Sequence, residues 1–249
     1  MLHITTIDLT AFCFLRTKFK HFRRHGYEVA LATTFGRFRE DLEPCCDFCF
    51  GVEIPRRIRP WQDFKALLQL IAVIRGYRPD VVHTYTSKAG LLGRLAARIC
   101  RVPLIVHTIY ELPQNSTSRP WLKKLYWALE KLAALWGHHF VTISQVNVEQ
   151  ILEERICPAA NLSLIREGIE LERYRPQVTA SEIRARWGLP PDAKILGIAA
   201  RLEPAKGHRD LLQAFSLLSE RHPELHLMIM GTGELAEALH AEVVRMNLQ

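Results

Sequence analysis

The sequence lacks any apolar run long enough to cross a lipid bilayer. Its best run is "ALLQLIAVI" at residues 66–74, which Gln69 interrupts, whereas a spanning helix needs about 20 apolar residues. The opening "MLHITTIDLTAFCF" has no basic start and carries Asp8 inside its apolar stretch, so it does not resemble a secretory leader. These absences predict a cytoplasmic protein, either free or held peripherally on the inner face of the membrane.

The cysteines lack the spacing of a structural metal site. The six cysteines include the cluster "CCDFC" at residues 45–49, but no second Cys or His pair stands at zinc-finger spacing. We expect partly buried thiols in a reducing compartment, with a metal at this cluster as the less favoured alternative. No metal and no cofactor are therefore expected.

Glycine is absent from the first strand-to-helix turn, which reads "TIDLTAFCFLR" at residues 6–16. A dinucleotide-binding fingerprint needs glycines there, for the tight turn and for the close approach of a pyrophosphate. The absence argues against a nicotinamide cofactor at this turn.

Basic residues are in excess in only one part of the chain. Residues 1–150 carry 21 Lys and Arg against 12 Asp and Glu, a net charge of +9, while residues 151–249 carry 12 against 14, a net charge of −2. A chain of 249 residues that is 48% hydrophobic is long enough for two modest domains. The positive charge belongs to the first of them.

Apolar strand-like runs alternate with helix-length amphipathic segments along the first 165 residues. Uninterrupted Val, Ile and Leu strands between helices predict an α/β fold with a parallel sheet covered on both faces. We expect Ser87 to cap one of the helices. Strands are expected at 2–7, 27–33, 50–55, 80–85, 103–109, 138–144 and 161–165, and helices at about 11–25, 61–77, 87–100 and 119–136.

The same pattern resumes after residues 166–192, which are rich in charge and proline and are expected to form a linker. Two strands and two helices then complete the chain, fewer strands than the five or six of an average sheet. We expect the later strand to leave Leu227 and Ile229 poorly covered. The strands are expected at 194–200 and 225–231, and the helices at about 207–221 and from about 234.

Two cations stand on the turn that follows the strand expected at 194–200. Arg201 leaves the strand, and Lys206 with Gly207 opens the next helix. In open parallel sheets, ligands sit beyond the carboxyl ends of the strands, where helix N-termini present unpaired N–H groups. A guanidinium fork and a mobile ammonium can converge there on a diphosphate. The alternative is that both cations form an ordinary solvated face.

A glycine turn, "GTGE" at residues 231–234, closes the next strand. Gly231 and Gly233 would let a ligand approach the backbone, although both could be ordinary turn residues. Glu234 and Glu242 have seven residues between them, which we interpret as accidental. We expect Glu242 on a solvated helix face.

The run "ILGIAARLEPAKGHRDLLQAFSLLSERHPELHLMIMGTGE" at residues 195–234 resembles the nucleotide-sugar segment of family 4 (group 1) glycosyltransferases. It contains the arginine turn, the K-G pair, the helix ending in H-P-x-L and the G-x-G-E strand end, in the order and spacing of that family. Residues 79–109, 129–144 and 165–176 are also similar to family segments, so the resemblance covers most of the chain.

The resemblance implies the GT-B fold, in which two Rossmann-like domains face each other across a cleft. It implies an acceptor-side domain over residues 1–165 and the start of a nucleotide-sugar domain at residues 193–249. The family's Glu-x7-Glu pair and base pocket would lie beyond Gln249, so we expect a C-terminally truncated and inactive chain. By the same resemblance, Arg201 and Lys206 are catalytic and hold the donor diphosphate, while the donor-binding residues are Gly207, Gly231, Gly233 and Glu234.

The N-terminal half departs from the family pattern where the acceptor is expected. "HTIYEL" at residues 107–112 has Tyr110 and Glu111 where many relatives have His and Gly. The resemblance places weak acceptor contacts at Thr10, Tyr110 and Glu111. We interpret His107, inside an apolar run, as a packing residue. The family's N-G-I-D appears as "EGIE" at residues 167–170.

A basic segment, "RTKFKHFRRHGY" at residues 16–27, interleaves cations with phenylalanines on an expected helix. The plain interpretation is that Phe14, Phe19 and Phe22 face the core while the cations are solvated. An anionic membrane surface is the favoured functional alternative, and nucleic acid is not expected because no basic stripe continues into the second domain. The candidate membrane contacts are Arg16, Lys18, Lys20, Arg23 and Arg24.

The function that these patterns imply is sugar transfer from a nucleotide-diphosphate sugar to a saccharide or lipid-linked acceptor in surface polysaccharide synthesis. Retention of the anomeric configuration follows from the resemblance only. The alternative is a non-catalytic module whose basic N-terminal half binds an anionic membrane or nucleic acid.

Overall fold

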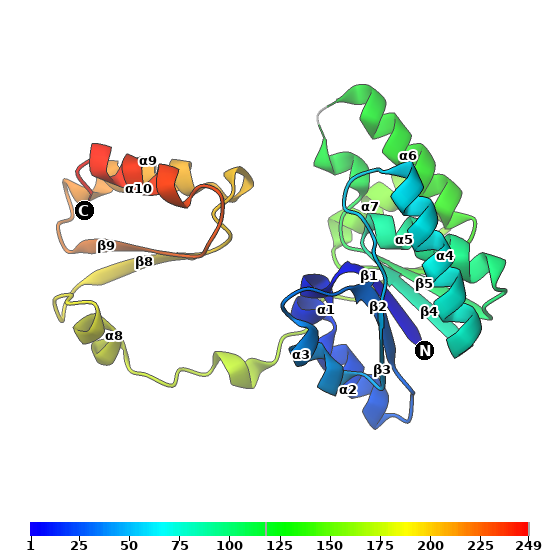
Figure 1. Cartoon of the computed structure of the whole chain (residues 1–249). Helices are drawn as coiled ribbons and strands as arrows, with labels where there is room; N and C mark the ends of the chain where they lie inside the picture. The colour runs from blue at the N-terminus through cyan, green and yellow to red at the C-terminus, as the bar shows by residue number, and fades with distance from the viewer. Residues whose placement is uncertain (118, 249) are drawn as a thin grey trace. The chain divides into compact units, whose positions relative to one another are not determined.

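The chain forms two compact units, the first ending at Glu170 and the second beginning at Leu171 (Figure 1). This computed structural model describes residues 1–117 and 119–248. The segment expected to be a linker, residues 166–192, contains a helix, α8 (Ala180–Arg186), with a complete capping box between Thr179 and Glu182.

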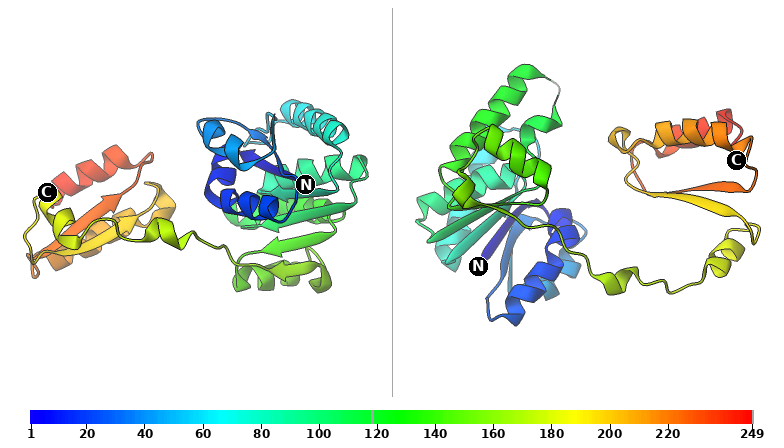
Figure 2. Two further views of the ribbon diagram at one scale, coloured as in Figure 1. Left: turned by 90° about the horizontal axis from the view of Figure 1, so that it is seen from below. Right: turned by 180° about the vertical axis from the view of Figure 1, so that it is seen from behind.

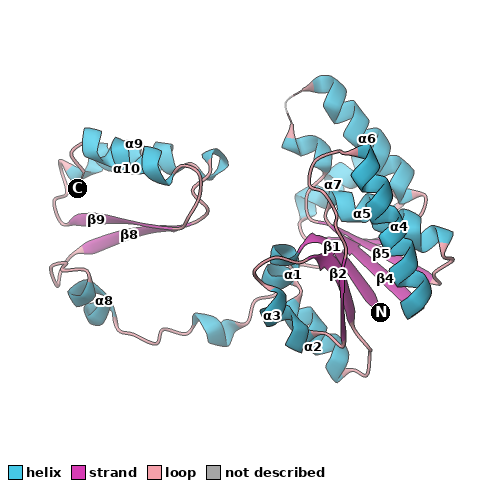
Figure 3. Ribbon diagram, in the orientation of Figure 1, coloured by secondary structure: helices cyan, strands magenta, loops and turns pink. Residues whose placement is uncertain are grey.

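A parallel seven-stranded sheet forms the centre of the first unit, in the order β3-β2-β1-β4-β5-β6-β7 (Figure 3). The order reverses between β1 and β4, so the crossovers before and after that point lie on opposite faces of the sheet. The parallel fold expected from the sequence is thus confirmed. The strands are β1 (Leu2–Ile7), β2 (Ala30–Thr34), β3 (Phe48–Gly51), β4 (Val81–Tyr85), β5 (Leu104–Ile109), β6 (His139–Thr142) and β7 (Leu162–Leu164).

Helices cover both faces of this sheet, with α1 to α3 on one face and α4 to α7 on the other (Figure 2). The buried face of α4 carries small and aliphatic side chains, Ala66, Leu70 and Ile74. On the opposite face of the sheet, Leu15 and Phe19 are fully buried. The helices are α1 (Asp8–Phe14), α2 (Arg16–Arg24), α3 (Arg39–Leu42), α4 (Pro60–Tyr77), α5 (Ser87–Ile99), α6 (Pro120–Ala134) and α7 (Gln145–Glu153).

Several local predictions were wrong. The helix expected at 11–25 begins at Asp8 and is divided at Leu15 into α1 and α2. The strand expected at 50–55 is β3, because pairing with β2 from Ala30↔Phe48 onward sets its position. Ser87 does not cap α5: Thr86 occupies the N-cap position, and no side chain caps the helix.

A buried ion pair joins α5 to α6. Arg94 Nη2 lies 2.7 Å from Glu130 Oε1, and both side chains are almost fully buried. Arg94 Nε also donates to the carbonyl oxygen of Gly90 at 2.8 Å. Removing one partner of such a pair leaves an uncompensated buried charge, which typically costs several kcal/mol.

A second buried polar cluster lies within the sheet. The Tyr85 hydroxyl lies 3.0 Å from both His3 Nδ1 and His83 Nδ1, and His83 Nε2 lies 2.8 Å from Thr108 Oγ1. Burial lowers the pKa of His83 to about 3 and that of His3 well below its usual value. Both imidazoles are therefore neutral at pH 7.

The second unit contains a two-stranded parallel sheet with α9 (His208–Ser219) and α10 (Ala236–Arg245) on one side (Figure 1). Its small core is formed by Leu202, Leu212 and Leu239. Leu227 and Ile229 pack against this core, so the expectation that they are poorly covered was wrong; on the two strands, the exposed large apolar residues are Leu196 and Met230. The elements are β8 (Lys194–Ala199), α9 (His208–Ser219), β9 (Leu225–Met230) and α10 (Ala236–Arg245).

Among the described residues, none of the helices combines the length and apolar character needed to cross a membrane.

We predict that acid destabilises the first unit through its buried histidines. His83 binds a proton below a pH of about 6.5 in the unfolded chain, but only below a pH of about 3 in the folded protein. The free energy of unfolding therefore falls as the pH is lowered from about 6.5 to about 3. His83 alone should cost about 1.4 kcal/mol per pH unit. Urea unfolding between pH 7 and pH 4 measures this slope. His83→Asn should flatten it, whereas the exposed control His25→Asn should not; equal slopes in all three proteins would refute the prediction.

Candidate functional site

The turn between β8 and α9 carries the two cations singled out in the sequence. β8 and β9 are parallel, so both strands end at the same edge of their sheet. After Arg201 the chain forms a short 3-10 turn, Pro204–Lys206, and Gly207 then takes the left-handed conformation (φ 69°) immediately before α9. Arg201, Lys206 and the amino end of α9 therefore lie on one short loop.

The two cations are exposed, and they differ in their partners. Arg201 Nη1 pairs with Glu203 Oε1 at 2.7 Å, with 63% of the arginine side chain exposed. Such an exposed pair contributes at most about 1 kcal/mol, so an incoming anion can compete for the guanidinium. Within the described part of the chain, the Lys206 ammonium has no ion-pair partner.

A residue that the sequence analysis did not single out, His208, fixes the backbone of this loop. It is the first residue of α9 and is buried, and its Nε2 donates to the Arg201 carbonyl oxygen at 2.9 Å. This bond joins the two ends of the loop. The only sequence signal was a histidine directly after the K-G pair.

Gly231 and Gly233 lie directly against the Arg201 turn. A Cβ on Gly231 would stand 1.9 Å from the Ala200 carbonyl oxygen, and one on Gly233 would stand 2.4 Å from that of Leu202. Three backbone hydrogen bonds join the two turns, among them Leu202 N to Thr232 O at 3.0 Å. The absence of side chains at both glycines therefore lets two loop backbones pack together beside the cations.

The two glutamates that follow differ in environment. Glu234 is exposed and precedes α10. The expectation that Glu242 lies on a solvated helix face was wrong. Its side chain is 11% exposed, and its carboxylate lies 3.4 Å from Arg209 Nε and 3.3 Å from Arg245 Nη2. Its packing against α9 explains the burial.

In the first unit, Tyr110 follows β5 at the carboxyl edge of the sheet and lies near the Lys18–Glu167 ion pair. Its ring lies 5.2 Å from that of Phe14. Burial, and then the nearby Glu167 carboxylate, raise the pKa of Tyr110, so the phenol stays protonated and can only donate a hydrogen bond to an anion. Glu167 also accepts a 2.7 Å hydrogen bond from Lys18 Nζ. Tyr110 was predicted from the sequence as an acceptor contact, whereas its neighbour Glu167 was not.

Of the other two expected acceptor residues, Thr10 lies half-buried in α1 and Glu111 is exposed after β5. Where the strand order reverses, the Thr6 and Thr86 hydroxyls lie 2.7 Å apart. Thr86 has φ 63° and ψ 151°, a conformation that a β-branched residue rarely adopts and that tends to occur at functional sites.

His107 is a packing residue, as expected. It is buried in β5, and its Nδ1 lies 2.8 Å from Thr84 Oγ1. Burial and then the charge of Arg94 lower its pKa, so it is neutral.

The basic segment of α2 is largely engaged within its own unit. Arg16 stacks over the Phe12 ring, Lys18 pairs with Glu167, and Arg23 pairs with Asp47 at 3.0 Å. Phe19 is buried, as the plain interpretation requires, whereas Phe14 is 47% exposed. Of the five candidate membrane contacts, only Lys20 and Arg24 have no partner among the residues that the structure describes.

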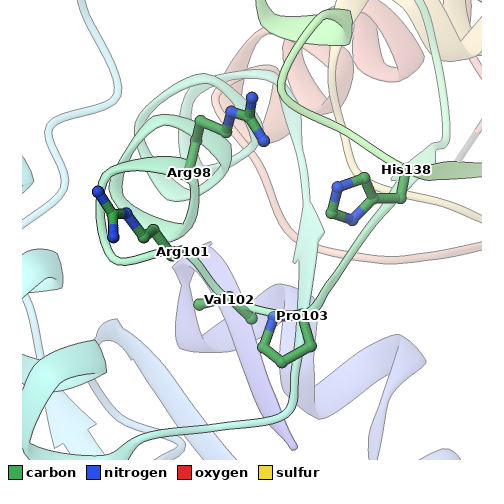
Figure 4. A pocket seen from close by; sticks show the side chains of 5 residues that line it. All are labelled: Arg98, Arg101, Val102, Pro103 and His138. Carbon is green, nitrogen blue, oxygen red and sulfur yellow. The ribbon is translucent and has the colours of Figure 1, made fainter.

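A cavity of about 500 Å³ lies at the opposite, amino edge of the same sheet. Arg98 and Arg101 line it but point in different directions (Figure 4). They do not converge on one anion, so we assign no site there.

Comparisons with known proteins identify the family. Residues 15–168 match the Glycosyl transferase 4-like domain, and residues 179–249 match Glycosyl transferases group 1. The chain belongs to the family 4 (group 1) glycosyltransferases. It is 30% identical over 187 residues, 74% of this chain and 48% of the relative, to an Escherichia coli UDP-Gal:alpha-D-GlcNAc-diphosphoundecaprenol alpha-1,3-galactosyltransferase. It is also 21% identical over 242 residues, 95% of this chain, to the Staphylococcus aureus capsular polysaccharide biosynthesis glycosyltransferase CapM.

Solved structures show that this glycosyltransferase has the GT-B fold. Anabaena HepE in complex with UDP and glucose matches with a TM-score of 0.76 at 15% identity, over 100% of this chain and 66% of that one. Thermosynechococcus elongatus sucrose-phosphate synthase matches with a TM-score of 0.74 at 16% identity, over 99% of this chain and 68% of that one. The chain spans 48% and 62% of the two curated relatives named above.

We predict that adding a methyl group to the glycine turn destabilises the second unit of this glycosyltransferase. Gly231→Ala should cost about 1–3 kcal/mol, because its Cβ overlaps backbone that cannot move independently. Gly197→Ala in β8 is the matched control, since its Cβ would meet only the flexible end of Met230 at 3.5 Å. Urea unfolding of both variants measures the difference. Equal stability would show that the contact between the two turns is not a constraint.

Proposed function

We propose that this glycosyltransferase transfers a hexosyl group from a nucleotide-diphosphate sugar, and that Arg201 and Lys206 hold the donor diphosphate. The observation that carries the proposal is the loop after β8, where an exposed guanidinium, an exposed ammonium and the amino end of α9 lie together beside the Gly231–Glu234 turn. Charged donors and helix N–H groups together suit a diphosphate. HepE, which shares the fold, has been solved in complex with UDP and with UDP-glucose.

The proposed mechanism is electrostatic. Negative charge builds up on the departing diphosphate, and cations already in place stabilise it without reorganising. Lys206 supplies an ammonium without a partner among the described residues, and Arg201 supplies a planar fork that can exchange Glu203 for phosphate oxygens. These contacts require neither a metal nor a strong general base. Retention of the anomeric configuration is proposed from family membership.

The proposed acceptor is a lipid-linked saccharide at the cytoplasmic face of the membrane. Family membership supports this, since one relative is named for transfer to a diphosphoundecaprenol-linked sugar and another for capsular polysaccharide biosynthesis. In the first unit, the partly exposed Lys18–Glu167 pair offers a hydrogen-bond donor and an acceptor suited to a sugar, and the protonated Tyr110 beside Glu167 is a further proposed contact. Thr10 and Glu111 remain proposed acceptor contacts.

We predict that Lys206→Ala weakens donor use by about 10- to 150-fold, the loss of one charge-assisted contact. Arg201→Lys should also be impaired, because a lysine lacks the bidentate fork. Arg221→Ala is the control, since this exposed arginine follows α9 at the far end of the helix. Steady-state kinetics of the complete gene product with UDP- and GDP-sugars test this. Near-native kcat/KM in both turn variants would refute the diphosphate clamp.

We also propose that residues 1–249 alone do not transfer sugar. Their second unit has two strands, and the chain spans 48% of the galactosyltransferase named above. Assays of this chain with the same donors should show donor binding without turnover, and robust transfer would contradict the proposal.

A further inference from the structure

A group of large apolar side chains is exposed at the start of α4. Ile58 is 52% exposed, Trp61 78%, Phe64 52% and Leu68 50%. The last three are spaced i, i+3, i+7 and so share one face of the helix. Ala66, Leu70 and Ile74 bury the other face against the sheet, so the exposed face is not turned toward the core of the unit.

The cations around this face are available for an external anion. Arg56, Arg57 and Arg59 are exposed, and none of the three guanidinium groups forms an ion pair with another described residue. Arg59 Nη1 donates only to the neutral Gln62 side chain at 3.3 Å.

Two acids beside these arginines in the sequence are already paired, Glu53 with Lys65 at 3.3 Å and Asp63 with Lys88. Asp63 Oδ1 lies 2.7 Å from Lys88 Nζ, with both side chains mostly buried. Lys88 also donates to the Arg57 carbonyl oxygen at 2.7 Å. The same lysine thus neutralises Asp63 and ties the arginine loop to α5.

A second exposed apolar stripe of the same composition lies on α6. Trp121 is 63% exposed and Leu125 40%, and Arg119, Lys123 and Lys124 are exposed beside them. Both α4 and α6 begin with the sequence Arg-Pro-Trp, with Pro in the first turn. Both also lie on the same face of the parallel sheet and begin at its carboxyl edge (Figure 2).

We infer that these two faces form one docking surface for an anionic phospholipid bilayer. We name it the tryptophan rim and define it as Arg56–Leu68 together with Arg119–Leu125. Tryptophan with flanking cations is the composition that lies at a membrane interface, where the ring reaches the headgroup level and the cations meet anionic lipid.

This inference rests on the proposed function and deepens it. The rim is at the carboxyl edge of the sheet, the same edge that carries Tyr110 and Glu167. A glycosyltransferase docked by this edge would present its acceptor side to a lipid-linked saccharide. We favour the rim over α2 as the membrane contact, because three of the five cations of α2 already have partners within the unit.

Co-sedimentation with phosphatidylcholine vesicles, with and without phosphatidylglycerol, tests the inference. The native chain should bind only the anionic vesicles, and binding should fade with salt. Trp61→Ser with Phe64→Ser, and separately Arg56→Gln, Arg57→Gln and Arg59→Gln together, should each weaken binding by at least about tenfold. Circular dichroism checks that these surface variants remain folded.

The controls remove similar groups elsewhere. Lys20→Gln with Arg24→Gln removes two unpaired cations from α2, and Leu217→Ser removes a side chain that is 74% exposed in the second unit. Both controls should bind like the native chain. Failure of the native chain to bind, undiminished binding of the rim variants, or loss of binding in the α2 control would overturn the inference.

Vesicle binding needs no nucleotide sugar, so its failure is distinguishable from failure of the proposed function. Kinetics of the complete gene product with a soluble acceptor analogue should be unchanged by the rim variants. Loss of that activity with retained vesicle binding would also overturn the assignment, since it would place these residues in the reaction.

Discussion

The candidate donor site depends on the contact between two loop backbones in the second unit. The turn after β9 lies so close to the turn after β8 that a single methyl group on Gly231 or Gly233 would overlap a carbonyl oxygen of Ala200 or Leu202. Backbone hydrogen bonds and the His208 side chain hold the same loops together. Arg201 and Lys206 project from this supported loop, so the site has a fixed backbone and mobile charged ends.

In the first unit, the reversal of strand order between β1 and β4 positions the polar side chains at the carboxyl edge of the sheet. Parallel strands place all their carboxyl ends at one edge, and the reversal separates the crossovers onto opposite faces. Thr86 stands at that point in an unusual conformation, and Tyr110, Lys18 and Glu167 gather along the same edge. The carboxyl edge of this sheet thus gathers polar side chains that remain within reach of solvent, whereas the polar groups inside the unit, such as His3, His83 and Tyr85, are paired with one another.

Most strands and long helices could be predicted from the alternation of apolar runs and amphipathic segments, and so could the position of Arg201 and Lys206 on the turn between β8 and α9. α7 was missed because Ser144 was assigned to the preceding strand, although its hydroxyl caps the helix. α8 was missed although its capping-box pattern, Thr179 and Glu182, was readable. The Lys18–Glu167 pair could not be predicted, because it joins residues 149 positions apart. Which face of β9 is covered also depends on where α9 and α10 pack, which periodicity alone does not determine.

The central claim is that the loop after β8 holds a diphosphate, and a titration of this chain with UDP followed by amide NMR tests it most directly. Because the N–H groups at the amino end of α9 would contact the phosphates, we expect the largest shifts at Gly207, His208 and Arg209, with smaller ones at Gly231–Glu234. Adding uridine in place of UDP should remove the shifts at α9. Unchanged amides at these positions under saturating UDP, or shifts confined to the far ends of β8 and β9, would contradict the account.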